Sequence, residues 1–247
     1  MFTISPSILA QGVAAPVTSA IGLRLDSGLE RYYVSQSAGN LPYAPKTWAA
    51  LVQMEGSQGV YITALSNGGL SQGWGIRSNG LSLSAFIGNG AYRTVTSYDM
   101  TSWKNDGAIH GVVCTYTGHS GSGELRMYVD RVLHSSASYT GFTDCHSDNW
   151  GLGGHGQGFN FGGVFFGLSL SDTVQNSSEV EQWFDDCKTA VDVVDFSSGP
   201  SEVWSVRRGA NDVPEWWPEE NGTGQTAYYG NGAAERYEST GSVQWGW

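Results

Sequence analysis

Lysine and cysteine are both scarce in this 247-residue chain, and long apolar runs are absent. Lysine occurs only at Lys46, Lys104 and Lys188, and the formal net charge is −11. Such an acidic balance argues against a nucleic-acid groove or an anionic membrane surface as the partner, because both would repel it. No stretch reaches the roughly 20 apolar residues of a membrane-spanning helix. We therefore expect no nucleic-acid partner and no membrane insertion.

The few cysteines and the start of the sequence both bear on where the protein folds. Cys114, Cys145 and Cys187 cannot all pair with one another, and no Cys-x-x-Cys motif occurs. Residues 1–23 contain no basic residue, and Pro16 interrupts the early apolar stretch, so the pattern of a secretory signal is missing. We expect free thiols and synthesis in a reducing cytoplasm.

Glycine, in contrast, is about twice as frequent as in an average protein. The clearest pattern lies at residues 123–137, where apolar and polar side chains alternate with the period of a strand. The expected core positions are Leu125, Met127 and Val129, and the expected water-facing positions are Glu124, Arg126, Tyr128 and Asp130. Asp130-Arg131 then interrupts the pattern, which predicts a hairpin.

Similar alternation recurs along the chain. Its single-face sets are Trp48, Ala50, Val52 and Met54; Leu81, Leu83, Ala85 and Ile87; His110, Val112, Cys114 and Tyr116; and Val164, Phe166, Leu168 and Leu170. Asn79-Gly80 between two such stretches is a strong hairpin signal. About ten short strands with turns between them predict an all-β protein, a sandwich of two packed antiparallel sheets.

One helix and an unusual final region complete the organisation. Ser178 and Glu181 have the spacing of a capping box, and an apolar stripe at helical spacing follows them. The stripe consists of Val180, Trp183, Phe184, Cys187 and Val191. Residues 191–247 carry five of the ten tryptophans and nine acids against three arginines, with Pro214 and Pro218 among them. We expect an irregular tail there that wraps its own domain or docks on another subunit.

The ordered series of patterns resembles a laminin G-like (concanavalin A-like lectin and glucanase) jelly roll. The segments that carry the resemblance are 23–28, 47–55, 110–118, 123–137, 150–154, 161–171 and the capped helix at 178. The resemblance implies a jelly roll at residues 21–190, preceded by an arm at 1–20 and followed by the tail at 191–247. Two positions depart from the family: Ile109 stands where a tryptophan is usual, and Arg131 fills the glycine position of the hairpin turn.

Catalytic patterns are weak. Glycoside hydrolases need two carboxylates that face each other across a sugar, yet the acids cluster on the predicted helix, where a solvated face explains them better. No Gly-x-Ser-x-Gly elbow occurs. We therefore expect a protein that is not an enzyme and needs no cofactor, with a glycoside hydrolase as the least favoured reading.

Two kinds of ligand site remain candidates. A sugar site needs an aromatic platform beside polar groups, and the candidate residues are Trp74, Trp103, Asn149, Trp150 and His155. The alternative is that these indoles fill the core between the sheets. A Ca²⁺ site could use the oxygen atoms of Asp144 and Asp148, with Asn149 beside them.

The tail offers a docking surface, because tryptophan is enriched at protein interfaces. Its candidate docking residues are Trp204, Trp216, Trp217, Trp245 and Trp247. A lectin-like jelly roll without an export signal is typical of a phage virion protein. We expect a non-enzymatic, multicopy or homo-oligomeric virion surface protein made in the host cytoplasm, a capsid decoration or tail-fibre component. Its partners would be other capsid or tail subunits and a glycan ligand; the alternative is a free-standing carbohydrate-binding module.

Overall fold

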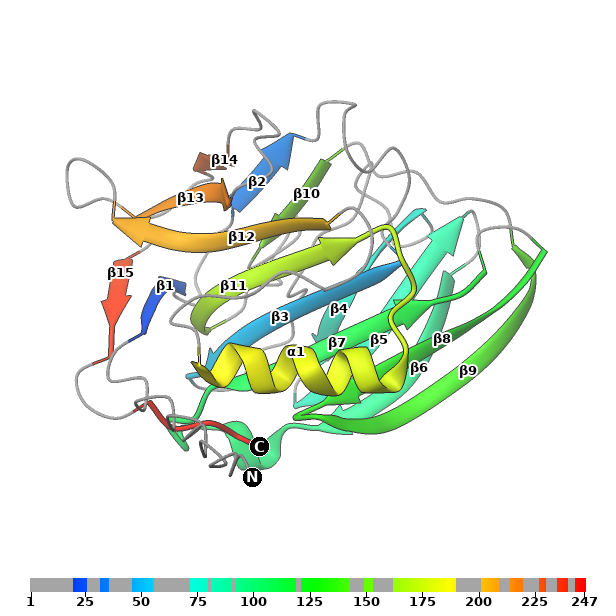
Figure 1. Ribbon diagram of the computed structural model, residues 1–247, viewed down its shortest axis with the longest axis horizontal. Coiled ribbons are helices and arrows are strands. Elements are labelled where there is room, and N and C mark those ends of the chain that lie inside the picture. Colours follow the sequence, from blue (N-terminus) through cyan, green and yellow to red (C-terminus); the bar gives the residue numbers. More distant parts are fainter. Residues whose placement is uncertain are drawn as a thin grey trace, which may run out of the picture.

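The computed structural model describes most of the chain between residues 20 and 247. The described ranges are 20–25, 32–35, 46–55, 72–79, 81–89, 92–118, 121–142, 149–152, 162–189, 201–208, 214–219, 227–229, 235–239 and 243–247. Strands dominate them (Figure 1). The strands are β1 (Ile21–Leu25), β2 (Tyr32–Ser35), β3 (Thr47–Met54), β4 (Gln72–Asn79), β5 (Ser82–Asn89), β6 (Tyr92–Asp99), β7 (His110–Tyr116), β8 (Gly121–Val129), β9 (Val132–Phe142), β10 (Asn149–Leu152), β11 (Gly163–Ser171), β12 (Ser201–Arg208), β13 (Pro214–Glu219), β14 (Ala227–Tyr229) and β15 (Glu235–Glu238). The helices are α1 (Ser177–Thr189) and the short 3₁₀ helix η1 (Thr101–Trp103).

Antiparallel pairing joins the strands into one large sheet and two small ones. The large sheet has nine strands, in the order β13-β12-β11-β3-β7-β8-β9, with β1 and β15 attached beside β11. One small sheet is β4-β5-β6 and the other is β10-β2-β14. The hairpin predicted at Asn79-Gly80 joins β4 to β5, with Asn79 opposite Ser82. The predicted all-β sandwich with one helix is confirmed.

The core lies between the nine-stranded sheet and β4-β5-β6. Side chains from both sheets fill it, including Trp48, whose ring centroid is 5.8 Å from that of Trp74. Three of the predicted faces are found there intact: the Trp48 to Met54 set, the Leu83 to Ile87 positions, and Leu125, Met127 and Val129. We call this the inner face of the large sheet.

The opposite, outer face is also buried, because α1 packs over it beside β3 and β7 (Figure 1). Its side chains form one buried cluster with residues of β3, β7, β8 and β11. The predicted apolar stripe of the helix packs there through Val180, Trp183, Phe184 and Cys187. Val191 lies outside the described residues. The helix also corrects the prediction that Tyr128 faces water: its side chain is 2% exposed, and its hydroxyl oxygen lies 3.2 Å from Oγ of Ser177.

The capping box of α1 begins two residues earlier than the sequence predicted. Asn176 accepts hydrogen bonds at Oδ1 from the amides of Ser178 (2.9 Å) and Glu179 (3.1 Å). Glu179 in turn accepts one from the amide of Asn176 at 2.7 Å. Asparagine is as good an N-cap as serine. The predicted capping box is therefore present, but it consists of Asn176 and Glu179 and not of Ser178 and Glu181.

A β-bulge in β11 corrects another predicted face. The pairing of β11 with β3 shifts between Phe165 and Gly167. An extra residue in one strand reverses the alternation beyond it. Val164 and Phe166 therefore pack on the outer face, whereas Leu168 and Leu170 pack on the inner one.

The turn between β8 and β9 adopts the left-handed conformation at two residues that carry side chains. The φ angles are +46° at Asp130 and +74° at Arg131, as a type I′ hairpin turn requires. Arg131 at the glycine position thus accepts a conformation that is costly for a side-chain-bearing residue. Nearby, Arg131 forms an ion pair with Asp185 of α1 at 2.8 Å.

The region expected to be an irregular tail contributes four strands. β12 pairs with β11, β13 with β12, β14 with β2, and β15 with β1. The prolines that argued against regular structure, Pro214 and Pro218, lie in β13 at one end of the strand order. An edge strand tolerates proline because its outward amides need no partner.

The other end of the large sheet is β9, which pairs with β8 alone among the described strands. Val132 and Leu133 at its start are 67% and 46% exposed. Cys114 and Cys187 are buried and form no disulfide within the described residues, while Cys145 lies outside them. Among the described residues, no helix has the length and hydropathy needed to cross a membrane.

Candidate functional site

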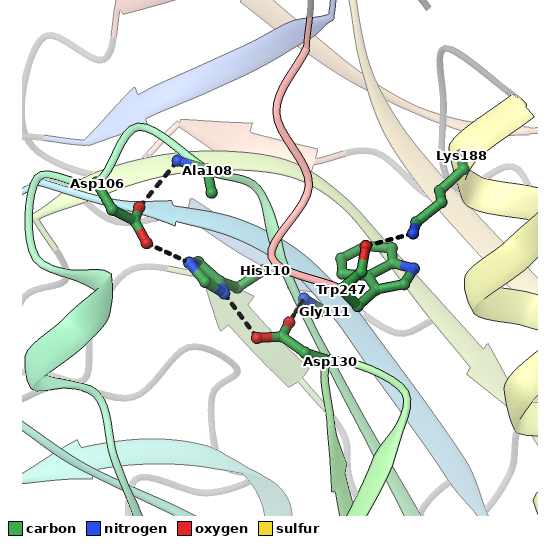
Figure 2. A network of polar contacts seen from close by, with 7 residues as sticks. All are labelled: Asp106, Ala108, His110, Gly111, Asp130, Lys188 and Trp247. Atoms are coloured by element: carbon green, nitrogen blue, oxygen red, sulfur yellow. Dashed lines mark hydrogen bonds and ion pairs between the residues drawn. The ribbon is translucent and has the colours of Figure 1, made fainter. Parts of the chain in front are cut away.

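A buried histidine between two carboxylates lies where β7 begins. His110 is the first residue of β7, Asp106 lies in the loop that follows η1, and Asp130 lies in the β8–β9 turn. Nδ1 of His110 is 2.7 Å from Oδ2 of Asp130, and Nε2 is 3.0 Å from Oδ2 of Asp106 (Figure 2). The His110 side chain is 5% exposed. We call these three residues the His110 cluster.

Backbone groups fix both carboxylates. Asp130 accepts the amide of Gly111 at Oδ1 (3.0 Å), and its own amide donates to the Gly111 carbonyl (2.9 Å). Asp106 accepts the amide of Ala108 at 2.8 Å (Figure 2). The contacts of Asp130 also tie the left-handed turn to β7, which helps to hold its backbone.

Trp103 completes the surroundings of the imidazole. Its indole stacks on His110 with a centroid distance of 4.1 Å and an interplanar angle of 11°. Burial alone would lower the pKa of His110, but the hydrogen bonds and negative charges of Asp130 and Asp106 outweigh it and raise that pKa. A protonated imidazole donates at both nitrogens, and an indole face attracts a cation. The cluster therefore favours the imidazolium form.

These contacts limit the chemistry of the cluster. A general base needs a ring nitrogen within hydrogen-bond reach of the proton it removes, and both nitrogens of His110 already meet carboxylates. Each carboxylate likewise holds a backbone amide and the imidazole. The arrangement suits a structural tie between a loop, a strand and a turn better than proton transfer to a ligand.

The segment 243–247 lies directly on this cluster. The amide of Ile109 donates to the carbonyl of Gln244 (2.8 Å), and the amide of Gly246 donates to the carbonyl of Ile109 (2.9 Å). Ile109 and Trp245 thus form a one-residue parallel bridge. Val243, Trp245 and Trp247 pack against the outer-face core.

Lys188 of α1 holds the far end of the segment. Its Nζ donates to the backbone carbonyl of Trp247 and lies 5.2 Å from the centroid of the indole ring (Figure 2). Burial lowers the pKa of Lys188, Asp185 acts in the opposite direction, and Arg131 adds to the lowering. Phe184 meets the Trp247 ring edge to face at 5.0 Å, and Trp245 does so at the same distance.

The sugar-site candidates fall into two groups. Trp74 and Trp103 are each 1% exposed and belong to the inner core. They offer no ring face to a ligand, so the expected exposed platform is wrong at these two positions and the alternative of core indoles holds. Asn149 and Trp150 form part of β10, which pairs with β2. Their side chains and the whole of His155 lie outside the described residues.

The metal and docking candidates are placed only in part. Asp144 and Asp148 lie outside the described residues, and the described ones contain no cluster of three or more metal-binding side chains. Trp204 lies in β12, and Trp216 and Trp217 lie in β13. The side chains of these three are not described. Trp245 and Trp247 pack in part on their own domain.

Sequence reasoning placed His110 correctly on the face of Val112 and Cys114 but missed the roles of Asp130, Lys188 and Gly246. One signal was present. A histidine on an otherwise apolar strand face needs polar partners, and the hairpin turn supplies an aspartate beside the strand. The contact with Gly246 joins positions 136 residues apart, and no local pattern predicts that.

Comparison with known proteins supports the fold and no more. No family model matches the chain, and no curated protein matches it. The chain is similar to the heptameric SAP-like pentraxin of Limulus polyphemus, with 10% identity and a TM-score of 0.50, over 87% of this chain and 97% of the pentraxin. That likeness supports a jelly roll and does not single out the laminin G-like branch.

Weaker similarities are found to two botulinum neurotoxin domains. The type G receptor-binding domain gives a TM-score of 0.43 at 10% identity, over 89% of this chain and 60% of that domain. The serotype D/C binding domain gives 0.44 at 13% identity, over 68% and 47%. The chain therefore spans less than two thirds of the toxin domains that it matches.

Proposed function

We propose that this protein is a non-enzymatic binding subunit of a virion surface, a capsid decoration or tail-fibre component, whose jelly roll binds a glycan. The observation that carries the non-enzymatic part is the closed His110 cluster. The imidazole of His110 is buried, and each of its two ring nitrogens is hydrogen-bonded to a carboxylate. Within the described part of the chain, this cluster offers no accessible acid and base to a ligand, which suits a binding role better than a catalytic one.

The two carboxylates of the cluster argue against a hydrolytic role. A glycosidase needs one carboxyl group to protonate the leaving oxygen and another to act as base or nucleophile across an open sugar site. Asp106 and Asp130 instead flank one imidazole, and Gly246 lies close to its Nδ1 edge. A sugar ring cannot enter between them while the imidazole and the segment 243–247 stay in place.

A glycan array tests the binding role. We expect saturable binding of the purified chain to at least one glycan class and reduced binding of Trp150→Ala, with Trp150→Phe retaining part of it because a stacking ring remains. Val132→Ala, at an exposed position of β9, serves as the matched control. Equal binding by all four proteins would show that Trp150 does not contact the glycan. No binding by any of them would show that the proposed glycan-binding role is wrong.

Release of reducing ends from polysaccharides tests the absence of catalysis. We expect none above a buffer blank. If hydrolysis is found and both Asp106→Asn and Asp130→Asn abolish it in folded protein, the non-enzymatic proposal is wrong.

Association with particles separates the virion subunit from its alternative, a free-standing carbohydrate-binding module. Mass spectrometry of particles banded on a density gradient should find the chain at a fixed ratio to the major capsid or tail protein. Recovery only from the soluble fraction would favour the free-standing module. The −11 charge suits either role, because it keeps an abundant protein soluble.

A further inference from the structure

The segment 243–247 is attached to its own domain by very few backbone contacts. Its pairing is a single bridge at Ile109, with two hydrogen bonds. Residues 240–242, which precede it, lie outside the described part of the chain. Unlike β12, which pairs with β11 over five positions, the segment forms only this one-residue bridge with the described part of the chain.

The contacts nevertheless select a particular sequence. A Cβ atom at Gly246 would lie 2.3 Å from Nδ1 of His110 and 3.0 Å from Oδ2 of Asp130. Those two groups are fixed by their mutual hydrogen bond and by the amide of Gly111, so neither can move aside cheaply. The surface therefore requires glycine at this position, with an indole on each side of it.

The neighbouring positions are recognised by ring and charge contacts. Trp247 meets the edge of Phe184 and lies under the ammonium group of Lys188, which also donates to its carbonyl. Gly111 allows Phe184 to approach β7, because a Cβ at that glycine would lie 2.3 Å from the phenyl ring. The receiving surface, made of Ile109, His110, Phe184 and Lys188, is thus preformed by α1 and β7.

The fit is incomplete on the outer side. Trp245 and Trp247 stay partly exposed, and Gln244 and Gly246 are exposed. The buried Nε1 of Trp247 has no hydrogen-bond partner within the described structure. A buried donor without an acceptor weakens the attachment, and this favours release of the segment.

We propose that the receiving surface is a recognition site for a Trp-Gly-Trp segment, and that segment 243–247 of a second copy of this chain can occupy it in place of the chain's own. The contacts described above are made by the segment to α1, to Ile109 and the adjoining β7, and to the β8–β9 turn, and none depends on which copy supplies it. Exchange preserves each contact, while neighbouring copies raise the local concentration of donors. The proposal rests on the proposed function only in that a multicopy surface brings copies together.

A peptide of residues 243–247 tests the site itself. In the full-length Gly246→Ala chain the added Cβ should displace the chain's own segment, and a labelled wild-type peptide should bind saturably by fluorescence anisotropy. The wild-type chain should bind it at least about tenfold more weakly, since its site is filled. A peptide with alanine at position 246 should lose binding to a similar extent. Equal affinity of both peptides for the variant, or no binding of either, would overturn the proposal.

Folding of the variant is checked by its melting curve. If Gly246→Ala does not fold, Trp247→Ala replaces it, because that change removes the ring contacts with Phe184 and Lys188 without a new collision. Failure of both variants to fold would show that the segment belongs to the core, and the exchange proposal would then be wrong.

Complementation between two full-length variants tests the second copy as donor. Lys188→Glu damages the receiving surface and frees an intact segment, whereas Gly246→Ala damages the segment and leaves the surface intact. We expect each variant alone to sediment as wild type and the mixture to form an additional species of two chains. Lys104→Glu, which makes the same charge change at an exposed position, should not complement. A mixture without the additional species would overturn exchange, whatever the glycan array and the particle ratio show.

Discussion

The inner face of the nine-stranded sheet is filled by apolar and aromatic side chains of two sheets, whereas the outer face is closed by a helix and a five-residue segment. The inner core includes Trp48, Trp74 and Trp103 at 0–1% exposure. The outer core is smaller. At its margin, Lys188 and two partly exposed indoles lie next to the His110 cluster, whose imidazole stacks on Trp103 of the inner core. Buried apolar volume therefore stabilises the inner face, whereas specific polar contacts stabilise the margin where the His110 cluster lies.

The largest expected effect comes from the inner face. Trp48→Ala should lower the free energy of unfolding by about 3–5 kcal/mol, because a fully buried indole leaves a cavity that its neighbours cannot fill. Denaturant titration measures it, with Val132→Ala at an exposed position as the control, where we expect a change within about 0.5 kcal/mol. If Trp48→Ala lowers the free energy of unfolding no more than the control does, buried volume does not stabilise the inner face.

Asp130 gives the sharpest test of the polar margin. Asp130→Ala should cost about 3 kcal/mol, because it leaves a buried imidazole without its nearest partner and strands the Gly111 amide. Asp130→Asn keeps an acceptor and a residue type that tolerates positive φ, so its loss should be nearer 1 kcal/mol. If the two variants unfold at the same denaturant concentration, the charge and acceptors of Asp130 do not hold this margin.

The pH dependence of stability tests the polar margin further through His110. Its pKa is raised above the ordinary 6.5 in the folded state. The stabilisation is therefore fully present below about pH 6.5 and is lost as pH rises through the folded value. We expect wild type to lose on the order of 1 kcal/mol more than His110→Gln between pH 6 and pH 9. Parallel curves for the two proteins would contradict a protonated cluster.

The smallest effect is expected at the strained turn. Arg131→Gly removes a left-handed side-chain-bearing residue, which gains about 1 kcal/mol, but it also frees the unfolded chain and breaks an exposed ion pair of little value. The net result should be a stabilisation of about 0.5 kcal/mol. Arg131→Ala, which loses the ion pair and keeps the strain, should not stabilise. If Arg131→Ala raises the melting temperature, the left-handed backbone at residue 131 is not the source of the strain.

The inner face could be predicted from the sequence because a period of two records it directly. Trp48 to Met54 and Leu125 to Val129 stand at alternate positions, and each set faces one core. Burial on the outer face could not be predicted where a second element covers the sheet. Tyr128 looks water-facing until α1 lies over it, and the bulge at Phe166 reverses a face that its letters suggest is continuous.

The His110 cluster could be predicted only in part, for a related reason. The strand pattern places His110, and the hairpin places Asp130. Asp106 is only four residues before His110, but it lies in a loop that no strand or helix period predicts, and nothing local brings residue 246 to the same imidazole. Trp74 and Trp103 show the opposite error, because they were predicted to be exposed and are buried. Tryptophans near predicted loops suggested a sugar platform, yet the bulk of an indole serves a sandwich core equally well.

The two ends of the large sheet have consequences for the behaviour of the protein in concentrated solution. β13 carries prolines at its end of the strand order, whereas β9 at the other end has neither proline nor a charged side chain over 11 residues. Such an edge invites pairing between molecules, and the −11 charge is what keeps molecules apart. At about 1 M salt the screening length falls to roughly 3 Å. Storage at high salt concentration, often chosen to protect a protein, should therefore promote self-association of this protein through β9.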